Sequence, residues 1–288
     1  MSLALLTGLG LALLVGLSLG LLGGGGSILT VPILTYVVGL PPREAIAASL
    51  FVVAVTSAIS VVGHARAGRV RWRTGLLFGA AGMVGAFLGG LLGGWIPGRV
   101  LMLAFALMMV ATSLAMLRGR RSSGSVAGSE SASVPKILGE GLAVGLVTGL
   151  VGAGGGFLVV PALVLLGGLS MGQAVGTSLV VIALKSFAGL GGYLTAVSLD
   201  WIVVGSFAAL AVLGSLFGAR MAGRIPEAAL RQGFGVFVLV MGVVVLAQEV
   251  PAPWGSVVVG GAAAAALTAT ACWGLIPSCP LRRAAIAG

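Results

Sequence analysis

Long apolar runs divide the sequence, and they determine the solvent in which the chain can fold. A helix needs about 20 apolar residues to span a lipid bilayer. Eight runs meet or approach this length: 3–22, 44–63, 74–95, 100–117, 172–192, 201–220, 232–248 and 255–276. A ninth run, 137–152, is slightly shorter, and two others, 27–39 and 156–168, are too short to cross alone. We therefore predict an all-α polytopic membrane protein.

The composition agrees with this environment. Hydrophobic residues make up 59% of the chain and charged residues only 8%, whereas soluble domains carry about 25% charged residues. Too few charged side chains are present to cover a water-facing surface, so we predict the lipid bilayer as the main partner. Long helical runs, rather than alternating segments of about ten residues, favour the inner (plasma) membrane over an outer-membrane barrel.

The basic residues mark one side of that membrane. Thirteen of the 16 Lys and Arg residues lie in four clusters at the ends of apolar runs: 66–73, 118–136, 220–231 and 282–283. Short cationic loops stay in the cytoplasm. The net charge of +10 is therefore interpreted as a topology signal, which places the C-terminus in the cytoplasm and excludes nucleic acid as a partner.

The chain repeats itself. Shifting the sequence by 129 residues gives a gap-free match over about a hundred positions, in which Pro32 falls on Pro161 and Trp72 on Trp201. We predict two homologous transmembrane repeats, a flexible cytoplasmic linker rich in Ser and Gly, and a C-terminal extension with an additional transmembrane segment. The repeats span 1–118 and 137–249, the linker spans 119–136, and the C-terminal extension spans 250–288.

The charged loops indicate how the two repeats are related. The first repeat has its basic loop at 64–73, but the equivalent loop at 193–202 carries no basic residue, and the second repeat is basic at 220–231 instead. Equivalent loops therefore lie on opposite sides, which predicts an inverted-topology repeat. Transporters built in this way bind their substrate at the repeat interface near the bilayer midplane.

A glycine turn precedes the short apolar run of each repeat. Each turn is predicted to break the preceding helix and to start a short, re-entrant one, whose unpaired N–H groups suit an anion. Irregular backbone at membrane depth occurs where protein or a cavity satisfies it. The alternative is that these glycines only allow close helix packing. The candidate substrate-binding residues in the turns are Gly24, Gly25, Gly26, Ser27, Gly154, Gly155 and Gly156.

Lys185 lies near the centre of the run 172–192. A charge inside the membrane is costly and usually faces a cavity or a substrate path. Lys185 would compensate the charge of an anion, or respond to coupled protonation; the alternative is a lysine that snorkels to the surface or pairs with a carbonyl. Its repeat mate is Thr56. Neighbouring hydroxyl residues are candidate hydrogen-bond donors to an oxyanion; the alternative is that they form hydrogen bonds between helices. They are Ser57, Thr177, Ser178 and Ser186.

The sequence offers no set of residues for catalysis. It has one histidine, six acidic residues and no Ser-His-Asp set, carboxylate pair or metal-ligating cluster. We therefore predict that the protein is not an enzyme and uses no cofactor and no metal site. The expected partners are a small anionic substrate and lipid. A coupling ion, either a proton or sodium, and assembly into a homo-oligomer are left open.

Several of these motifs resemble the sulfite exporter TauE/SafE family of membrane transporters. The similarity rests on the runs at 20–32 and 152–161, the Ala-Val-Gly-Thr-Ser-Leu stretch at 174–179 and the Gly-Arg-Ile-Pro turn at 223–226. It covers about 16–247 and implies export of sulfite, organosulfonates or related sulfur-containing anions. Lys185 departs from the family pattern, which commonly has an uncharged polar residue there.

The favoured interpretation is a secondary transporter that moves a small oxyanion by alternating access across the repeat interface. Two alternatives remain open from the sequence. One is an anion channel that uses the same broken helices, and the other is a membrane scaffold protein that transports nothing.

Overall fold

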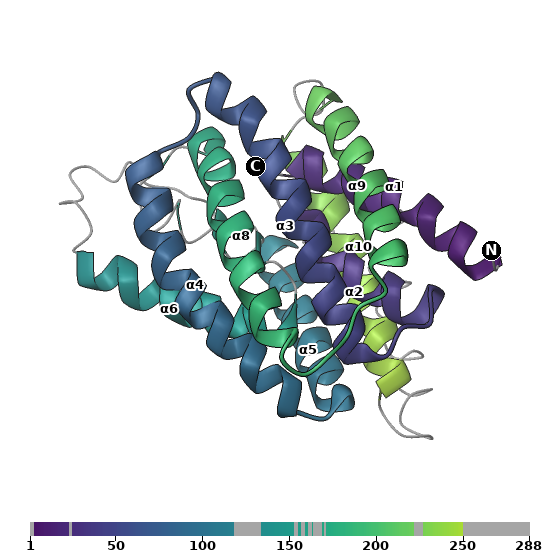
Figure 1. The fold of residues 1–288 in the computed structure, drawn as a ribbon. Coiled ribbons are helices and arrows are strands. Elements are labelled where there is room, and N and C mark those ends of the chain that lie inside the picture. Colours follow the sequence, from purple (N-terminus) through teal and green to yellow (C-terminus); the bar gives the residue numbers. More distant parts are fainter. Residues whose placement is uncertain are drawn as a thin grey trace, which may run out of the picture.

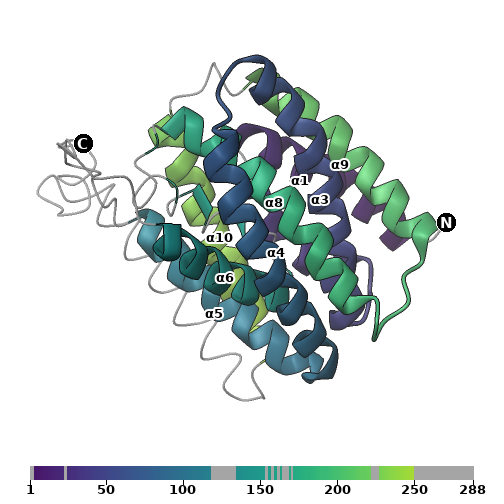
Figure 2. The ribbon, with the colours of Figure 1, turned by 60° about the vertical axis from the view of Figure 1, so that its left-hand side comes forward.

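The computed structural model describes residues 3–22, 25–117, 134–152, 155–156, 159–160, 163, 169, 171–221 and 227–249. Within these ranges every regular element is a helix, and the helices form one bundle (Figures 1 and 2). The predicted linker and the C-terminal extension lie almost entirely outside the described residues, as do Gly24, Gly154 and most of the run 156–168.

Eight long helices follow the predicted apolar runs. They are α1 (Leu3–Leu22), α3 (Pro42–Arg66), α4 (Trp72–Trp95), α5 (Gly98–Leu117), α6 (Val134–Val151), α8 (Met171–Tyr193), α9 (Trp201–Met221) and α10 (Glu227–Glu249). Four of them, α3, α4, α8 and α9, are long and apolar enough to cross a membrane, and shorter apolar helices accompany them. The prediction of an all-α polytopic membrane protein is confirmed.

Local sequence signals explain several helix ends. Helix α3 begins at Pro42, where the missing N–H of proline costs nothing. It ends at Arg66; two residues later Gly68 has a φ of +68°, which suits glycine, and Arg69 N donates to His64 O at 3.0 Å to satisfy a terminal carbonyl. Helix α9 begins after Asp200, whose Oδ1 accepts a hydrogen bond from Ile202 N at 2.9 Å.

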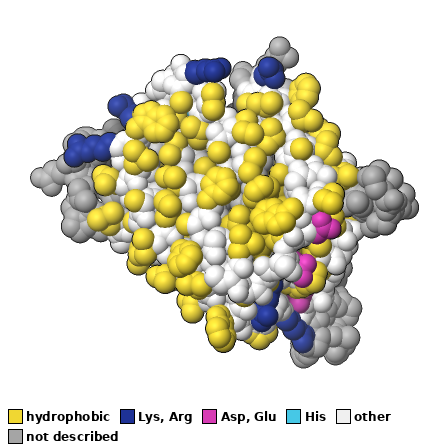
Figure 3. Space-filling view, viewed as in Figure 1, with side chains coloured by type: hydrophobic (Ala, Val, Ile, Leu, Met, Phe, Trp, Pro, Cys, Tyr) yellow, Lys and Arg dark blue, Asp and Glu magenta, His cyan; other side chains and the backbone are white. Residues whose placement is uncertain are grey.

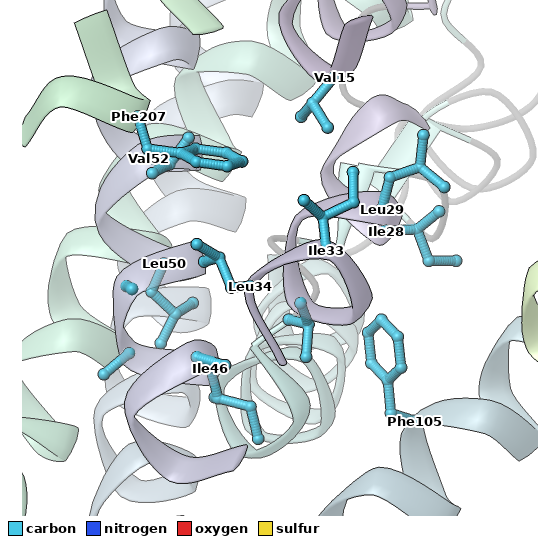
Figure 4. Packing of buried hydrophobic residues seen from close by; sticks show 14 of the residues in the cluster. Val15, Ile28, Leu29, Ile33, Leu34, Ile46, Leu50, Val52, Phe105 and Phe207 are labelled. Carbon is cyan, nitrogen blue, oxygen red and sulfur yellow. The ribbon is translucent and has the colours of Figure 1, made fainter. Parts of the chain in front are cut away.

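The first short apolar run is a broken helix, as predicted. A 3₁₀ turn η1 (Gly25–Leu29), a short α2 (Thr30–Pro32) and a π-helical turn η2 (Ile33–Val37) follow one another. A Cβ on Gly8, near the start of α1, would meet Val38 Cγ2 at 2.6 Å, so the segment runs back along α1. Its own buried side chains, among them Ile28 and Leu34, belong to an apolar cluster that also contains Phe105 of α5 (Figure 4).

Two helix pairs interlock through glycines, and the contacts recur at the repeat offset. A Cβ on Gly16 of α1 would collide with Ala211 O of α9, and a Cβ on Gly145 of α6 would collide with Gly82 O of α4. Gly145 is the repeat mate of Gly16, and Ala211 is the repeat mate of Gly82. Three more glycine contacts recur in the same way: Gly20 with Gly149, Gly85 with Gly214, and Gly89 with Gly218. Helix α1 of the first repeat therefore packs on α9 of the second, and α6 of the second repeat packs on α4 of the first.

The repeat mates α3 and α8 pack against each other in antiparallel directions. Near the start of α8, a Cβ on Gly176 would lie 3.3 Å from His64 Cβ, near the end of α3. Near the end of α8, a Cβ on Gly189 would lie 3.4 Å from Leu50 Cδ1, near the start of α3. The midpoints of the two helices therefore lie side by side.

The surface is that of a membrane protein. Hydrophobic side chains fill the face seen in Figure 3, and Lys and Arg side chains lie near its rim. Trp72 and Trp201 are about half exposed at the first residues of α4 and α9, where interfacial aromatic residues belong. The α3–α4 connection and the end of α9, which carry basic residues, lie at the same end of the bundle (Figures 1 and 2).

Candidate functional site

Lys185 lies in the interior of the bundle. Its side chain is 1% exposed, and its Nζ donates a hydrogen bond to Thr148 Oγ1 of α6 at 2.9 Å. Thr148 is equally buried, and its own hydroxyl donates to Val144 O at 2.7 Å. The lysine therefore does not snorkel to the surface, and among the described residues a hydroxyl receives its hydrogen bond.

This ammonium has no ion-pair partner among the described residues. The carboxylates that the structure describes sit elsewhere: Glu44 in the first turn of α3, Asp200 before α9 and Glu249 at the end of α10. Glu140 is on α6, eight residues before Thr148, a distance of about 12 Å along a helix. Burial of an uncompensated charge is costly, so this position calls for a negative charge.

The second glycine turn touches the lysine head group. Gly155 has a φ of +64°, and a Cβ there would collide with both Lys185 Nζ and Thr148 Cγ2. Gly155 O accepts a hydrogen bond from Val159 N at 2.9 Å, so a helical turn starts at this glycine. Only a residue without a side chain fits here, and its backbone lies directly against the ammonium.

The turn is also held by the first half of the chain. Gly152 has a φ of +73°, and its carbonyl oxygen accepts a hydrogen bond from Ser49 Oγ of α3 at 3.1 Å. A Cβ on Gly152 would collide with Ile46 Cγ2, one turn earlier on α3. Residues of both repeats therefore build the surroundings of Lys185.

Two buried hydroxyls add unused hydrogen-bonding capacity. Ser57 of α3 and Ser186 of α8 are each 1% exposed, and the Oγ atoms of both lack a partner among the residues that the structure describes. They are repeat mates near the midpoints of the antiparallel pair. Buried polar groups are almost always hydrogen-bonded, so these two hydroxyls, which are adjacent in sequence to Thr56 and Lys185, remain available to a polar ligand. Thr56 itself donates to Val52 O at 2.6 Å within its own helix.

The other predicted site residues lie apart from this group or in the first glycine turn. Thr177 Oγ1 accepts a hydrogen bond from Arg71 N at 3.0 Å, and Ser178 Oγ donates to Val175 O at 2.8 Å. These two residues are seven and eight positions before Lys185, about 10–12 Å along the helix. Gly25, Gly26 and the buried Ser27 belong to η1. Gly156 is buried next to Gly155.

Thr148 is the functional candidate that the sequence did not single out. Its repeat mate is Leu19, so comparison of the halves draws no attention to it. The one available signal was a hydroxyl residue inside the apolar run 137–152, four residues before the glycine turn at Gly152. Such a residue commonly bonds its own helix, and the contact to Lys185 spans 37 positions.

Every side chain of this group is closed off from bulk solvent. Thr56, Ser57, Thr148, Lys185 and Ser186 are at most 1% exposed. A cavity of about 450 Å³ opens near the start of α3, lined by residues such as Arg43, Gly98 and Ser198. Arg43 lies 14 residues before Ser57 on α3, about 21 Å along a helix, so this cavity does not reach the lysine.

Comparisons with known proteins agree on one class. The sequence profile of the sulfite exporter TauE/SafE family matches residues 8–245. A probable membrane transporter protein of Xylella fastidiosa (strain Temecula1) is 34% identical over 242 residues, which cover 82% of this chain and 91% of the relative. Another, from Methanocaldococcus jannaschii, is 32% identical over 180 residues, covering 60% and 66%. No solved structure matches the chain.

Proposed function

We propose that this chain, which belongs to the sulfite exporter TauE/SafE family of membrane transporters, is a secondary transporter that exports small sulfur-containing anions such as sulfite or organosulfonates. The anion binds beside Lys185, and the two repeats expose it to one side of the membrane at a time. The protein sits in the plasma membrane, with the linker and the C-terminus in the cytoplasm. Membership of the family supports the class of substrate.

One observation carries the proposal: Lys185 is buried without a carboxylate partner among the described residues. An ammonium inside the membrane needs a compensating negative charge. A small anion placed next to Nζ would supply that charge. Attraction to a fixed cation would hold the anion there, so the site would discriminate against neutral solutes and cations.

The polar groups around Lys185 suit an oxyanion. Ser57 and Ser186 bring two hydroxyls that have no partner within the described part of the chain, and each can donate one hydrogen bond. The glycine turn at Gly155 brings backbone to within contact of the ammonium. The full predicted binding set comprises Gly24, Gly25, Gly26, Ser27, Thr56, Ser57, Gly154, Gly155, Gly156, Thr177, Ser178, Lys185 and Ser186. Thr177 and Ser178, about 10–12 Å from Lys185 along α8, would contact the anion at another stage of its path.

Alternating access through inverted repeats is the mechanism we propose. Two features support it: the repeat mates α3 and α8 are antiparallel, and glycine contacts between the halves recur at the repeat offset. The two basic connections at one end of the bundle support a cytoplasmic location for that end. A closed site also favours a carrier over a channel, because an open channel needs a continuous path while Lys185 and its neighbours are shielded.

The test is anion flux into proteoliposomes that contain the purified chain. Sulfite, thiosulfate, sulfoacetate and sulfate are offered in turn, with and without imposed gradients of protons and of sodium. We expect saturable transport of at least one of these anions, driven by one of the gradients. A unitary conductance would instead identify a channel, and absence of flux for all four anions would favour a scaffold protein.

Lys185→Met then tests the site. This change removes the charge and keeps most of the side-chain length, so we expect transport and anion binding to fall at least tenfold, since a buried charge-assisted hydrogen bond is worth about 1.5–3 kcal/mol. Lys136→Met is the matched control, because Lys136 is the other lysine of the chain and lies at the start of α6. Equal anion affinity in both variants would remove Lys185 from the site.

A further inference from the structure

We propose that Thr148 is a positioning residue, which holds the Lys185 ammonium against the second glycine turn and thereby sets the affinity for the anion. The inference rests on the proposed function, because it concerns the anion site of that function. It adds a residue that belongs to neither the repeat pattern nor the predicted site. Its contact with Lys185 joins helices α6 and α8, and the two residues lie 37 positions apart in the sequence.

The hydrogen bonds of Thr148 show in which direction it acts. A hydroxyl has one proton to donate and two lone pairs. Thr148 donates its proton to Val144 O at 2.7 Å and accepts from Lys185 Nζ at 2.9 Å. Because its proton is used within its own helix, the hydroxyl presents lone pairs to its surroundings. Thr148 therefore cannot donate to an anion, and it acts on the anion only through the lysine.

The methyl group of Thr148 fixes the same arrangement from the other side. A Cβ on Gly155 would collide with Thr148 Cγ2 as well as with Lys185 Nζ. The threonine therefore contacts the glycine turn with its methyl group and the ammonium with its hydroxyl. Threonine is branched at Cβ and has few χ1 rotamers, so one rotamer satisfies both contacts. The lysine side chain has many rotatable bonds, and this contact selects one place for its head group.

The arrangement occurs once in the chain. The repeat mates of Thr148 and Lys185 are Leu19 and Thr56. Leu19 is buried and apolar, and Thr56 bonds its own helix at Val52 O. The first repeat thus lacks both the cation and the hydroxyl that would position it. We therefore expect one anion per chain, held toward the second repeat rather than on the axis between the repeats.

The experiment measures anion binding to the full chain in lipid nanodiscs by titration calorimetry. The probes are sulfite, thiosulfate, sulfoacetate and sulfate, each titrated separately. Thr148→Val keeps the methyl group and the shape, so we expect Kd to rise about tenfold, the effect of losing one hydrogen bond to a charged group. Thr148→Ser keeps the hydroxyl, so we expect its Kd to stay within about threefold of the wild-type value.

Thr112→Val is the matched control. Thr112 of α5 is buried and donates to Met108 O at 2.6 Å, four residues earlier, as Thr148 does to Val144. The control therefore removes the same intrahelical bond without touching the lysine, and its Kd should equal that of the wild type. If Thr148→Val does not fold, Thr148→Ala removes the hydroxyl with less crowding, and the same rise in Kd is expected.

Each outcome decides between two claims. If the wild type binds none of the four anions, the proposed function fails and the positioning role fails with it. If Lys185→Met weakens binding but Thr148→Val behaves like Thr112→Val, only the positioning role is overturned. A serine variant as weak as the valine variant also overturns it, because the hydroxyl alone would then not suffice. A stoichiometry of two anions per chain overturns the single, asymmetric site.

Discussion

Gly155→Ala is the substitution for which the structure gives the most definite expectation. Gly155 has a φ of +64°, and its missing Cβ leaves the space that Lys185 Nζ and Thr148 Cγ2 occupy. A left-handed backbone costs a residue with a Cβ about 1–2 kcal/mol. Displacement of the ammonium from Thr148 adds about 1.5–3 kcal/mol for a lost hydrogen bond of a charged group. Together these terms predict a loss of about 3–5 kcal/mol.

The loss should appear in two measurements. For a chain of this size it corresponds to a thermal midpoint lower by roughly 6–20 °C, measured by intrinsic fluorescence in detergent. The displaced ammonium should also raise Kd for the transported anion, since the lysine no longer faces the same space. The reference anion is whichever of the four tested anions the wild type transports.

Gly205→Ala is the control for this prediction. Gly205 lies within helix α9, and no heavy atom lies within 4 Å of the position that its Cβ would take. An alanine inside a helix is favoured over glycine by about 0.5–1 kcal/mol, so this variant should be as stable as the wild type or slightly more stable. If Gly155→Ala unfolds at the same temperature as Gly205→Ala and binds the anion equally well, the assembly of lysine, threonine and glycine described above is wrong.

Two further predictions concern hydroxyls. Ser57→Ala and Ser186→Ala remove hydroxyls for which no described residue is a partner, so the thermal midpoint should stay the same or rise, while Kd for the anion should increase in each variant. A stability loss of 1 kcal/mol or more would show that these hydroxyls bond within the protein. Tyr193→Phe removes the hydrogen bond that Tyr193 Oη donates to Leu150 O at 2.5 Å, so the free energy of unfolding should fall by about 1 kcal/mol. A more stable phenylalanine variant would contradict this contact.

Apolar runs located the helices well but not their ends. The run 44–63 lies inside α3, which extends from Pro42 to Arg66, and the run 232–248 lies inside α10, which extends from Glu227 to Glu249. Hydropathy detects the part of a helix that prefers lipid. The helical hydrogen bonds continue beyond it into the interface, where charged side chains are tolerated, so the ends depend on caps and turns such as that at Gly68.

Glycines serve two structural purposes in this chain, at different positions. Gly85 and Gly89 of α4 let α6 approach closely, because a Cβ on either would collide with the α6 backbone. Gly152 and Gly155 instead have positive φ and form the break before the second short run. The sequence could not assign these roles residue by residue, since close approach and positive φ are both properties of the folded backbone.

The candidate site was predictable only in part for a related reason. Lys185 stood out because a charge within an apolar run needs an explanation wherever it lies. Thr148 did not, because a threonine within a helix can bond its own backbone, as Thr56 and Thr112 do. Its contact with Lys185 depends on how α6 packs beside α8, and no local pattern encodes that packing.

The repeat explains the framework of this molecule, and the departures from the repeat explain its candidate site. Glycine contacts between the halves recur at one offset because backbone approach requires the same small residue in both copies. A buried cation has a different requirement, since every further charge taken into the membrane interior adds to the cost of burial. A lysine at position 56 as well as at position 185 would place two ammonium groups near the middle of an antiparallel helix pair, where their repulsion is poorly screened. With Thr56 as its repeat mate, Lys185 has no second ammonium to repel it in this helix pair.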